Sequence, residues 1–354
     1  MLPVDVIDAA DAIELVGGGL APEELGPFSG VPALFVRTTE PGTAASCAAL
    51  LRRLPCVAVA VDEAGATPAG LDDFDVLVTA RADPARPWTG HFDGIETSLD
   101  QLRTTIELSP LAAVALVQLL RLGERLDVRD ALVAESFTYG LLQSGDEFRC
   151  WLERQPDRRH RESDEPPVRV ERTGSEVRLE LHRPEARNAY DVAMRDALVA
   201  ALTGVQADPS VESIRLEGAG PTFCSGGDLS EFGATPDPVT GHLVRATRSA
   251  GWWLAELADR VTARVHGACV GAGVELPAFG ARVIADRATT FMLPEVSMGL
   301  VPGAGGTASI PRRIGRHRTA ALALLGTPVG AATALEWGLA DEITGGPEPH
   351  YRRR

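Results

Sequence analysis

Two glutamates, twenty positions apart, lie in segments whose residue types could do chemistry. Glu275 ends the glycine-rich run HGACVGAGVE at residues 266–275, and Glu295 lies in LPEVSMGLVPGAGGT at residues 293–307. A third segment, FCSGGDL, occupies residues 223–229. Glycine-rich turns let the backbone approach a ligand closely and aim several N–H groups at one oxygen atom. Two carboxylates and two such N–H donors are the groups needed to add or remove water beside a thioester carbonyl.

Each of these segments, taken alone, also has an ordinary interpretation. The small residues at 225–227 fit a plain strand–turn–helix junction with Asp228 near a helix start. Glu275 could stand in the first turn of a helix only because the helix dipole favours a carboxylate there. Glu295 follows the largely apolar residues 291–293, and such surroundings raise a carboxyl pKa enough for general-acid catalysis near neutral pH. The alternative for Glu295 is a surface glutamate after a proline.

The composition restricts the class of protein. The chain has 354 residues, of which 45% are hydrophobic, so it is long enough for one large domain or two of ordinary size around a substantial core. Its formal net charge of −15 disfavours binding to nucleic acid or to an anionic membrane. Because the chain contains arginine but no lysine, a phosphate on a ligand must be met by arginine or by backbone N–H groups.

The cysteines and the N-terminus predict a cytoplasmic protein. The five cysteines show no metal-ligand spacing, so we expect reduced thiols and no metal site. Met1 is not followed by a basic region and an apolar core, so no signal peptide is expected. The longest apolar run, residues 111–120, is too short to span a bilayer and predicts a buried helix. The cysteines are Cys47, Cys56, Cys150, Cys224 and Cys269.

A charged, proline-bearing stretch divides the chain. Residues 155–167, QPDRRHRESDEPP, predict an exposed linker between a first domain at residues 1–154 and a second at residues 168–354. In the second domain, strands and helices alternate, which implies an α/β domain with parallel strands. We expect strands at 168–170, 177–181, 214–216, 261–265 and 283–285, and helices at 191–206, 247–257, 320–325 and 331–338.

The first domain shows no catalytic constellation. Its only histidine is His91, and a lone histidine is more often a surface or packing residue. A Ser109-Pro110 pair should end one helix and open the next. We expect strands at 33–36, 57–61 and 76–79, and helices at 45–54, 99–106, 111–122 and 129–154, the last with an interruption at 141–144.

In order and spacing, the motifs resemble the crotonase superfamily, the enoyl-CoA hydratases and isomerases. The resemblance covers residues 168–345 and begins at LHRPEARNA, residues 181–189, which is similar to the family's opening motif. It continues through FCSGGDL, HGACVGAGVEL, PEVSMGLVPGAGGT and GLADE at residues 338–342. The implied fold class is α/β. We expect a crotonase-like ββα spiral core, preceded by a smaller degenerate α/β and helical region.

The resemblance implies four catalytic positions. The backbone N–H groups of Gly227 and Ala272 would form the oxyanion hole. The family usually has glycine at the second position, and alanine serves there if its dihedral angles are not left-handed. Glu275 would hold and deprotonate the water that attacks the β-carbon, and Glu295 would exchange a proton with the α-carbon. Family members that only isomerise double bonds often lose the first carboxylate, so both being present favours hydration, although the chemistry of the superfamily is varied.

Coenzyme A is implied as part of the thioester substrate, with no separate cofactor. Backbone of two segments would bind its adenine and pantetheine portions. A basic residue common in the family is Ser230 here, so an arginine would have to meet the phosphates. The resemblance also implies a homo-oligomer, a trimer or hexamer. The binding residues would be Arg187, Asn188, Ala189, Cys224, Ser225, Gly226, Asp228 and Leu229.

The ends of the chain depart from the family pattern. Crotonases continue past the GLADE-like motif with helices that cover the acyl pocket, whereas this sequence stops shortly after it. Residues 99–156 resemble that helical tail, including SPLA at 109–112, and residues 31–80 resemble a shortened crotonase core. We hypothesise an internal duplication in which the tail of the first copy caps the second copy's pocket, in the same chain or in a neighbour. The alternative is an unrelated helical N-terminal domain.

Three functions remain open from the sequence. The first is hydration of a 2-enoyl-CoA to a 3-hydroxyacyl-CoA. The second is double-bond isomerisation, or another crotonase-type acyl-CoA reaction in secondary metabolism. The third is a non-catalytic acyl-CoA-binding or assembly subunit, against which the intact Glu275 and Glu295 argue. Trp252 and Trp253 either line an acyl pocket or belong to the core or an interface.

Overall fold

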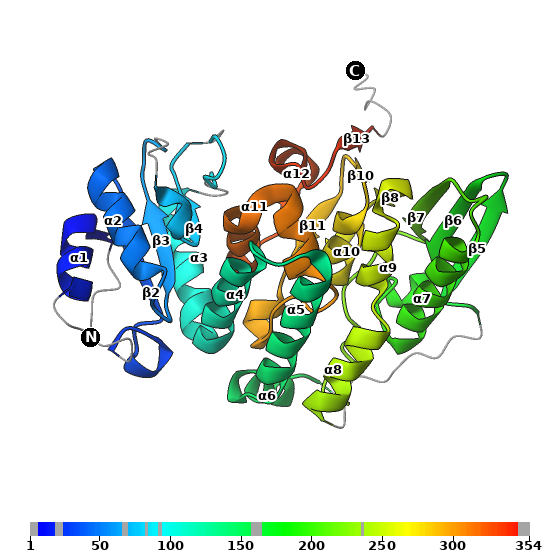
Figure 1. Ribbon diagram of the computed structural model, residues 1–354, viewed down its shortest axis with the longest axis horizontal. Helices are drawn as coiled ribbons and strands as arrows, with labels where there is room; N and C mark the ends of the chain where they lie inside the picture. Colours follow the sequence, from blue (N-terminus) through cyan, green and yellow to red (C-terminus); the bar gives the residue numbers. More distant parts are fainter. Residues whose placement is uncertain are drawn as a thin grey trace, which may run out of the picture. The chain divides into compact units, whose positions relative to one another are not determined.

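The computed structural model describes residues 6–17, 24–65, 70–81, 84–90, 94–156, 165–234 and 237–345 (Figure 1). The chain forms two compact units that interleave along the sequence. The first unit comprises residues 1–155, 294–301 and 314–327, and the second comprises residues 156–293, 302–313 and 328–354. Glu295 therefore belongs to the first unit, whereas Glu275 belongs to the second. Most of the predicted linker, residues 157–164, lies outside the described residues.

The first unit contains a four-stranded parallel sheet in the order β1-β2-β3-β4. Its central strand β3 is the run VAVAV, buried at every position, as expected of β-branched and small residues inside a covered parallel sheet. Helices α1 and α2 pack on this sheet in one apolar cluster. The bounds are β1 (Ile7–Asp8), β2 (Ala33–Arg37), β3 (Val57–Val61), β4 (Val76–Val78), α1 (Ala9–Gly17) and α2 (Pro41–Leu51).

The three helices predicted after this sheet form in the first unit, the last of them divided in two. α3 (Ile95–Leu108) and α4 (Pro110–Gly123) meet at Ser109, and their axes differ by 106°. The predicted helix 129–154 is two helices, α5 (Val128–Gln143) and α6 (Asp146–Glu153), because Ser144 and Gly145 interrupt it. In the described part of the chain, no single helix is long and apolar enough to cross a membrane. α3 and α4 meet that length and composition only together, as a bent pair.

The second unit is built on a six-stranded sheet in the order β13-β10-β8-β7-β6-β5. The hairpin β5–β6 is antiparallel, as predicted, and every other pair is parallel. Helix α7 (Val192–Ala207) begins where predicted, because the Asp191 carboxylate accepts a hydrogen bond from the Met194 N–H at 2.7 Å. The bounds are β5 (Val168–Thr173), β6 (Glu176–Leu181), β7 (Ser213–Gly218), β8 (Val261–Val265), β10 (Arg282–Asp286) and β13 (Glu342–Thr344).

A small second sheet, in the order β12-β11-β9, positions the glycine-rich turn that precedes Glu275. β9 (Ala268–Val270) and β11 (Thr290–Met292) are parallel, and β12 (Val329–Gly330) is antiparallel to β11. At the end of this ladder the Gly271 N–H donates to the Met292 carbonyl at 3.0 Å. The direction of the chain after β9 is therefore fixed by β11.

The remaining helices differ from the predictions at their ends. The predicted helix 247–257 begins later, as α9 (Ala250–Glu256), because Ser249 caps it by accepting from the Trp252 N–H at 3.1 Å, and α8 (Pro238–Thr247) before it was not predicted. α11 (Gly306–Leu325) is longer than predicted and is kinked at Gly315, whose φ is 79°. This kink lies next to the point where the chain passes from the second unit to the first. α12 (Ala331–Trp337) forms as predicted.

Candidate active site

The two segments that carry the predicted oxyanion donors lie side by side in the second unit. Cys224 and Cys269 form an isolated parallel bridge, and the Val270 N–H donates to the Cys224 carbonyl at 3.0 Å. Directly after Val270, the chain turns at Gly271 into the short helix α10 (Ala272–Glu275). A side chain at Gly273 would collide with the Cys224 carbonyl, so the close approach of these segments requires glycine there.

The N–H groups of Gly227 and Ala272 share one property. Neither donates to another residue in the described part of the chain. Ala272 is the first residue of α10, where N–H groups have no partner inside the helix. The left-handed φ, 49°, belongs to the preceding Gly271, and Ala272 is not among the residues of positive φ. The condition for alanine to serve at position 272 is therefore met.

Glu275 is buried and its orientation is fixed by the next glycine-rich turn. Its side chain is 2% exposed. One oxygen, Oε2, accepts hydrogen bonds from the N–H groups of Ala304 at 2.7 Å and Gly306 at 2.8 Å. A Cβ at Gly306 would lie 2.7 Å from the Glu275 Cγ, so glycine is required there. The PGAGG turn at residues 302–306 thus acts as a cradle for this carboxylate.

Tyr190 is a candidate active-site residue that was not predicted from the sequence. Its backbone flanks Gly227, because the Tyr190 N–H donates to the Gly226 carbonyl at 2.8 Å and its carbonyl accepts from the Asp228 N–H at 3.2 Å. Burial raises the pKa of its phenol, and the nearby Cys224 and Glu275 raise it further against the opposing charge of Arg195. The phenol therefore stays protonated near Glu275. Tyr190 directly follows the motif residues 187–189, and this position was the only sequence feature that pointed to it.

The segments predicted to bind coenzyme A are hydrogen-bonded to each other. The Ser225 N–H donates to the Arg187 carbonyl at 3.1 Å. Asn188 is fully buried, and its Nδ2 donates to the carbonyls of Ala219, Thr222 and Phe223 at 2.8, 2.9 and 3.1 Å. The Asn188 side chain therefore holds the start of the FCSGGDL segment in place, and the Asn188 N–H is itself occupied, since it donates to the Arg183 carbonyl at 2.8 Å.

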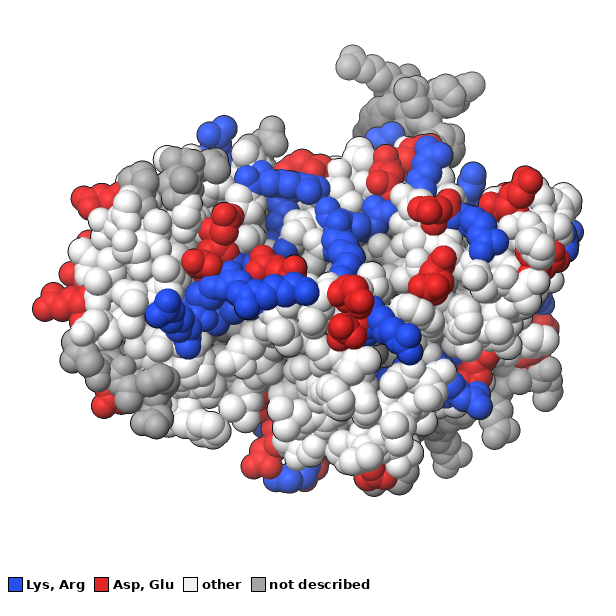
Figure 2. Space-filling view, viewed as in Figure 1, with Lys and Arg blue, Asp and Glu red and all other residues white. Residues whose placement is uncertain are grey.

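Arg187 is the predicted residue best placed to meet a phosphate. It is exposed, has a left-handed φ of 54°, and makes no ion pair with any described residue. Several other exposed arginines are paired, for example Arg172 with Asp208 at 2.6 Å. Figure 2 shows basic and acidic side chains close together on the face drawn.

The side chains of the other predicted binding residues mostly contact the protein itself. Burial opposes ionisation of Asp228, but hydrogen bonds from Ser230 and Arg183 hold its pKa below the usual value. Burial raises the pKa of the Cys224 thiol to about 12, so it stays protonated. Ala189 is buried and its carbonyl accepts from the Arg183 guanidinium at 2.9 Å. Ser225 and Leu229 are half-buried, and Gly226 has a positive φ of 91°.

Glu295 lies in the first unit, on the 3-10 helix η7 (Glu295–Met298). η7 packs against α3, α4 and α6, so helices of the same chain's N-terminal half cover this glutamate. Burial raises the pKa of Glu295 to about 8. Its own backbone N–H opposes this rise, and the negative charge of Glu135 adds to it. The Oε2 atom is out of contact with solvent and has no hydrogen-bond partner among the described residues.

Close packing holds η7 against α6. Gly299 ends η7 with φ of 74°, and a Cβ there would lie 2.6 Å from the Phe148 backbone nitrogen. The neighbouring Glu147 accepts from the N–H groups of Leu111 at 2.7 Å and Ala112 at 3.0 Å, which satisfies the start of α4. The carboxylate of Glu147 thus joins α6 to the SPLA motif at the start of α4, and both helices pack against η7.

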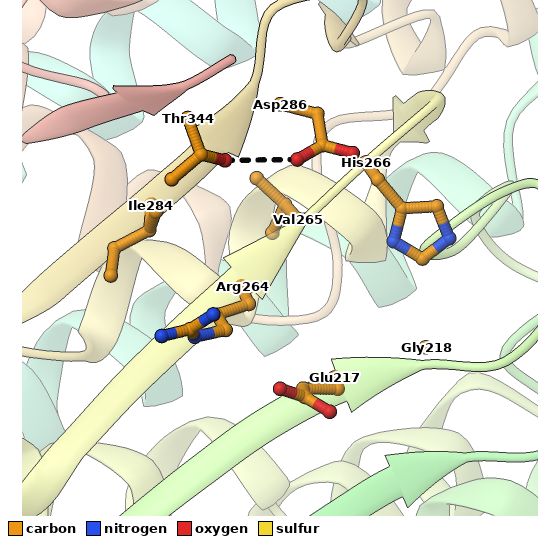
Figure 3. Close-up of a pocket in the computed structure, with 8 residues that line it drawn as sticks. All are labelled: Glu217, Gly218, Arg264, Val265, His266, Ile284, Asp286 and Thr344. Atoms are coloured by element: carbon orange, nitrogen blue, oxygen red, sulfur yellow. Dashed lines mark hydrogen bonds between the residues drawn. The ribbon is translucent and has the colours of Figure 1, made fainter. Parts of the chain in front are cut away.

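A separate pocket lies at the carboxyl ends of β7, β8, β10 and β13 (Figure 3). The side chains in view include Glu217, Arg264 and His266, and Thr344 donates to Asp286 at 2.9 Å. None of the predicted site residues lines it. No group of three or more potential metal ligands occurs in the residues that the structure describes.

Comparison with known proteins identifies the family. The sequence matches the enoyl-CoA hydratase/isomerase family over residues 171–348. The 1,2-epoxyphenylacetyl-CoA isomerase of Escherichia coli is 38% identical over 165 residues, which are 46% of this chain and 63% of that protein. The mevalonyl-coenzyme A hydratase SIDH of Beauveria bassiana is 34% identical over 173 residues, 46% of this chain and 61% of that protein.

A probable enoyl-CoA hydratase of Rhodobacter capsulatus is 35% identical over 178 residues, which are 50% of this chain and 68% of that protein. The chain belongs to the enoyl-CoA hydratase/isomerase family, the crotonase superfamily. It spans less than two thirds of the length of the Escherichia coli and Beauveria relatives. The resemblance seen in the sequence is confirmed, as is the mixed α/β fold class.

Proposed function

We propose that this chain catalyses a crotonase-type reaction on an acyl-CoA thioester, and that the reaction is hydration of a 2-enoyl-CoA to a 3-hydroxyacyl-CoA. The observation that carries the proposal is in the second unit. There a buried Glu275, whose Oε2 accepts hydrogen bonds from Ala304 and Gly306, ends the short helix whose first N–H, that of Ala272, donates to no described residue. Hydratases and an isomerase both occur among the relatives.

The first step is polarisation of the thioester. The carbonyl oxygen would accept hydrogen bonds from the N–H groups of Gly227 and Ala272, which stabilise the negative charge that develops on it. Removing one such donor typically costs about 3–4 kcal/mol of transition-state stabilisation. Gly271 and Gly273 contribute indirectly, since they permit the turn and the close packing on which the Ala272 position depends.

Proton transfer would then complete the addition of water. Glu275, whose Oε2 accepts hydrogen bonds from the Ala304 and Gly306 N–H groups, would accept a proton from the water whose oxygen bonds to the β-carbon. The electron pair of the double bond moves toward the thioester oxygen. Glu295, protonated at neutral pH because its pKa is about 8, would deliver its proton to the α-carbon. One water is added, and the proton on Glu275 must return to Glu295 before the next turnover.

Isomerisation is the second candidate, and it is favoured by the Escherichia coli relative's name. The same two carboxylates could remove a proton from one carbon and return it to another. Assays of the full chain on crotonyl-CoA and longer 2-enoyl-CoAs distinguish the two reactions. We expect hydration of at least one substrate. Failure to hydrate any chain length would refute the proposal and favour isomerisation or another acyl-CoA reaction.

Variants test the assigned carboxylates. Glu275→Gln and Glu295→Gln should each lower kcat/KM at least about 100-fold, the usual contribution of a general acid or base. Unchanged turnover in both variants would show that neither carboxylate is catalytic and would favour a binding or assembly subunit.

The role of the N-terminal half is part of the proposal. We propose that residues 1–154 are a degenerate crotonase copy whose helices α3, α4 and α6 replace the family's C-terminal tail over Glu295. We also propose a homo-oligomer of the trimer or hexamer type, and native mass measurement of the full chain checks it. The acyl-CoA phosphates would be met by Arg187, whose guanidinium is exposed.

A further inference from the structure

Arg183 is a buried cation in the second unit, and the proposed mechanism gives it no role. Only 2% of the residue is exposed. Its Nη1 donates to the Ala189 carbonyl at 2.9 Å and lies 2.7 Å from Oδ2 of Asp191 and 3.3 Å from Oδ2 of Asp228. A guanidinium is rarely removed from water unless partners offset the cost. Here the partners come from two separate segments of the chain.

The two segments that Arg183 connects meet in a backbone bridge. Tyr190 forms an isolated parallel bridge with Gly227. The Tyr190 N–H donates to the Gly226 carbonyl at 2.8 Å, and the Tyr190 carbonyl accepts from the Asp228 N–H at 3.2 Å. The guanidinium therefore contacts the residues on both sides of Tyr190 and the residue that follows Gly227.

This bridge sets the direction of the Gly227 N–H. The Gly226 carbonyl and the Gly227 N–H belong to one planar trans peptide, so they point in opposite directions. Because the carbonyl faces Tyr190, the N–H points away from the Tyr190 segment, and it donates to no residue in the described part of the chain. The direction of this donor thus depends on how firmly the two bridged segments are held together.

The Asp228 carboxylate passes the contact with Arg183 on to the turn after Gly227. Its Oδ1 accepts from the Ser230 N–H at 3.0 Å and from the Ser230 hydroxyl at 2.6 Å, while its Oδ2 faces Arg183. The Asp228 side chain is 14% exposed, so little water competes for these contacts. Charge-assisted hydrogen bonds are stronger and more sharply directed than neutral ones. Arg183 and Asp228 therefore restrain the backbone on both sides of the Tyr190–Gly227 bridge.

We propose that Arg183 is a positioning residue that acts through Asp228 to hold the Gly227 N–H in the direction needed to donate to the thioester carbonyl. The proposal rests on the proposed function for the role of Gly227 as an oxyanion donor. An oxyanion donor acts most strongly on the oxygen that gains charge in the transition state. Loss of its alignment should therefore lower kcat much more than it raises KM.

Asp228→Asn breaks the ion pair while keeping the turn. Asparagine retains an oxygen for Ser230 but turns an amide N–H group toward Arg183, and Arg183 keeps its contact with Asp191, so its charge stays compensated. In the full chain we expect kcat for a 2-enoyl-CoA to fall about 10- to 100-fold, approaching the loss of one donor, with KM within about threefold of the wild type. An unchanged kcat would overturn the proposal.

Asp208 provides a matched control in the same unit. Its Oδ1 accepts from the Ser210 N–H at 2.9 Å and from the Ser210 hydroxyl at 2.5 Å, and its Oδ2 accepts from Arg172 at 2.6 Å. This repeats the contacts of Asp228 in the turn between α7 and β7, outside the glycine-rich motifs. Asp208→Asn should keep the wild-type kcat. An equal fall in both variants would refute a specific role for Arg183 and Asp228.

The carbonyl stretching band of bound butyryl-CoA, isotope-labelled at the carbonyl carbon, tests the donor itself. Butyryl-CoA has no double bond to hydrate, so this infrared measurement does not depend on turnover. A well-aligned donor polarises the carbonyl and lowers its stretching frequency. We expect the band of the wild-type complex to lie below its position in water, and Asp228→Asn to move it back toward that position. A band that stays at the wild-type position in Asp228→Asn would overturn the proposal.

Arg183→Lys provides a second variant, which decides the question if Asp228→Asn does not fold. Lysine keeps the charge but replaces the planar guanidinium by a point charge, which cannot hold the same set of acceptors. We expect the band to move in the same direction as in Asp228→Asn, and an unmoved band would refute the role of Arg183. Where both variants fold, the double variant should lose no more kcat than the worse single variant, because the two residues act along one path. Additive losses would contradict action through Asp228.

Activity and the infrared band separate this proposal from the proposed function. A band that moves in Asp228→Asn, in a chain that hydrates no 2-enoyl-CoA, would uphold the role of Arg183 and refute the hydratase assignment. Hydration by the full chain, together with an unmoved band and an unchanged kcat in Asp228→Asn, would uphold that assignment and refute the role of Arg183.

Discussion

The raised pKa of Glu295 makes a prediction about stability that needs no substrate. Burial, with the charge of Glu135, moves this pKa from 4.5 to about 8. The folded chain therefore binds a proton that the unfolded chain releases between these two pH values, and stability must fall as pH rises through this window. At about 1.4 kcal/mol for each pH unit, the loss is at most about 5 kcal/mol. Since the side chain is only half-buried overall, solvent screening reduces it to roughly 2–4 kcal/mol.

Glu295→Gln should abolish this contribution, because glutamine does not ionise. Urea unfolding of both proteins, followed by circular dichroism at pH values between 4.5 and 9, gives the difference in unfolding free energy. We expect the unfolding free energy of the variant, relative to that of the wild type, to rise by roughly 2–4 kcal/mol between pH 4.5 and pH 9. Comparing the two proteins at each pH cancels the other titrating groups. A difference that does not change with pH would refute the assignment of the raised pKa to Glu295.

Gly306→Ala should displace Glu275, because a Cβ would lie 2.8 Å from its Oε2. We expect kcat to fall about 100-fold with the fold retained, whereas Gly204→Ala, in open space on α7, should keep wild-type kcat. Glu147→Ala should lower the unfolding free energy in urea by about 1–2 kcal/mol, because the first N–H groups of α4 lose their acceptor. A fully stable variant would contradict that role. Burial, with the charge of Arg316, lowers the pKa of His317 from 6.5 to about 4, so its contribution to stability should be lost as pH falls through that window. His317→Gln should flatten the acid limb of a stability–pH curve, and an unchanged limb would argue against it.

The sequence predicts best what depends on local patterns. Alternating apolar residues predict the β5–β6 hairpin, and Asp191 marks the start of α7, as observed. The glycine-rich runs are informative because each glycine is demanded by a close contact, such as that of Gly273 with the Cys224 carbonyl. Where two backbone segments approach closely, only glycine fits, and the resulting glycine-rich run is visible in the sequence. The proposed donor positions Gly227 and Ala272 come from the family resemblance that these runs carry.

Prediction is weaker where long-range packing decides the structure. No local pattern shows that residues 294–301 and 314–327 pack with the N-terminal half, since that depends on contacts with residues more than 140 positions away, such as that of Gly299 with Phe148. Gly315 is the one local indication of this arrangement, because its positive φ divides α11 next to the residue where the chain passes from the second unit to the first. Tyr190 was missed because its phenol gains meaning only through the fold around Cys224 and Glu275.

The same long-range packing explains the raised pKa of Glu295. A glutamate after a proline, taken from the sequence, is either a surface residue or an acid with a raised pKa. α3, α4 and α6 decide between these by removing Oε2 from water, and Glu135 adds a like charge. The contacts of Gly299 with α6 and of Glu147 with α4 hold that arrangement together. A change in the N-terminal helices should therefore alter the proton affinity of Glu295 without touching a residue of the glycine-rich motifs.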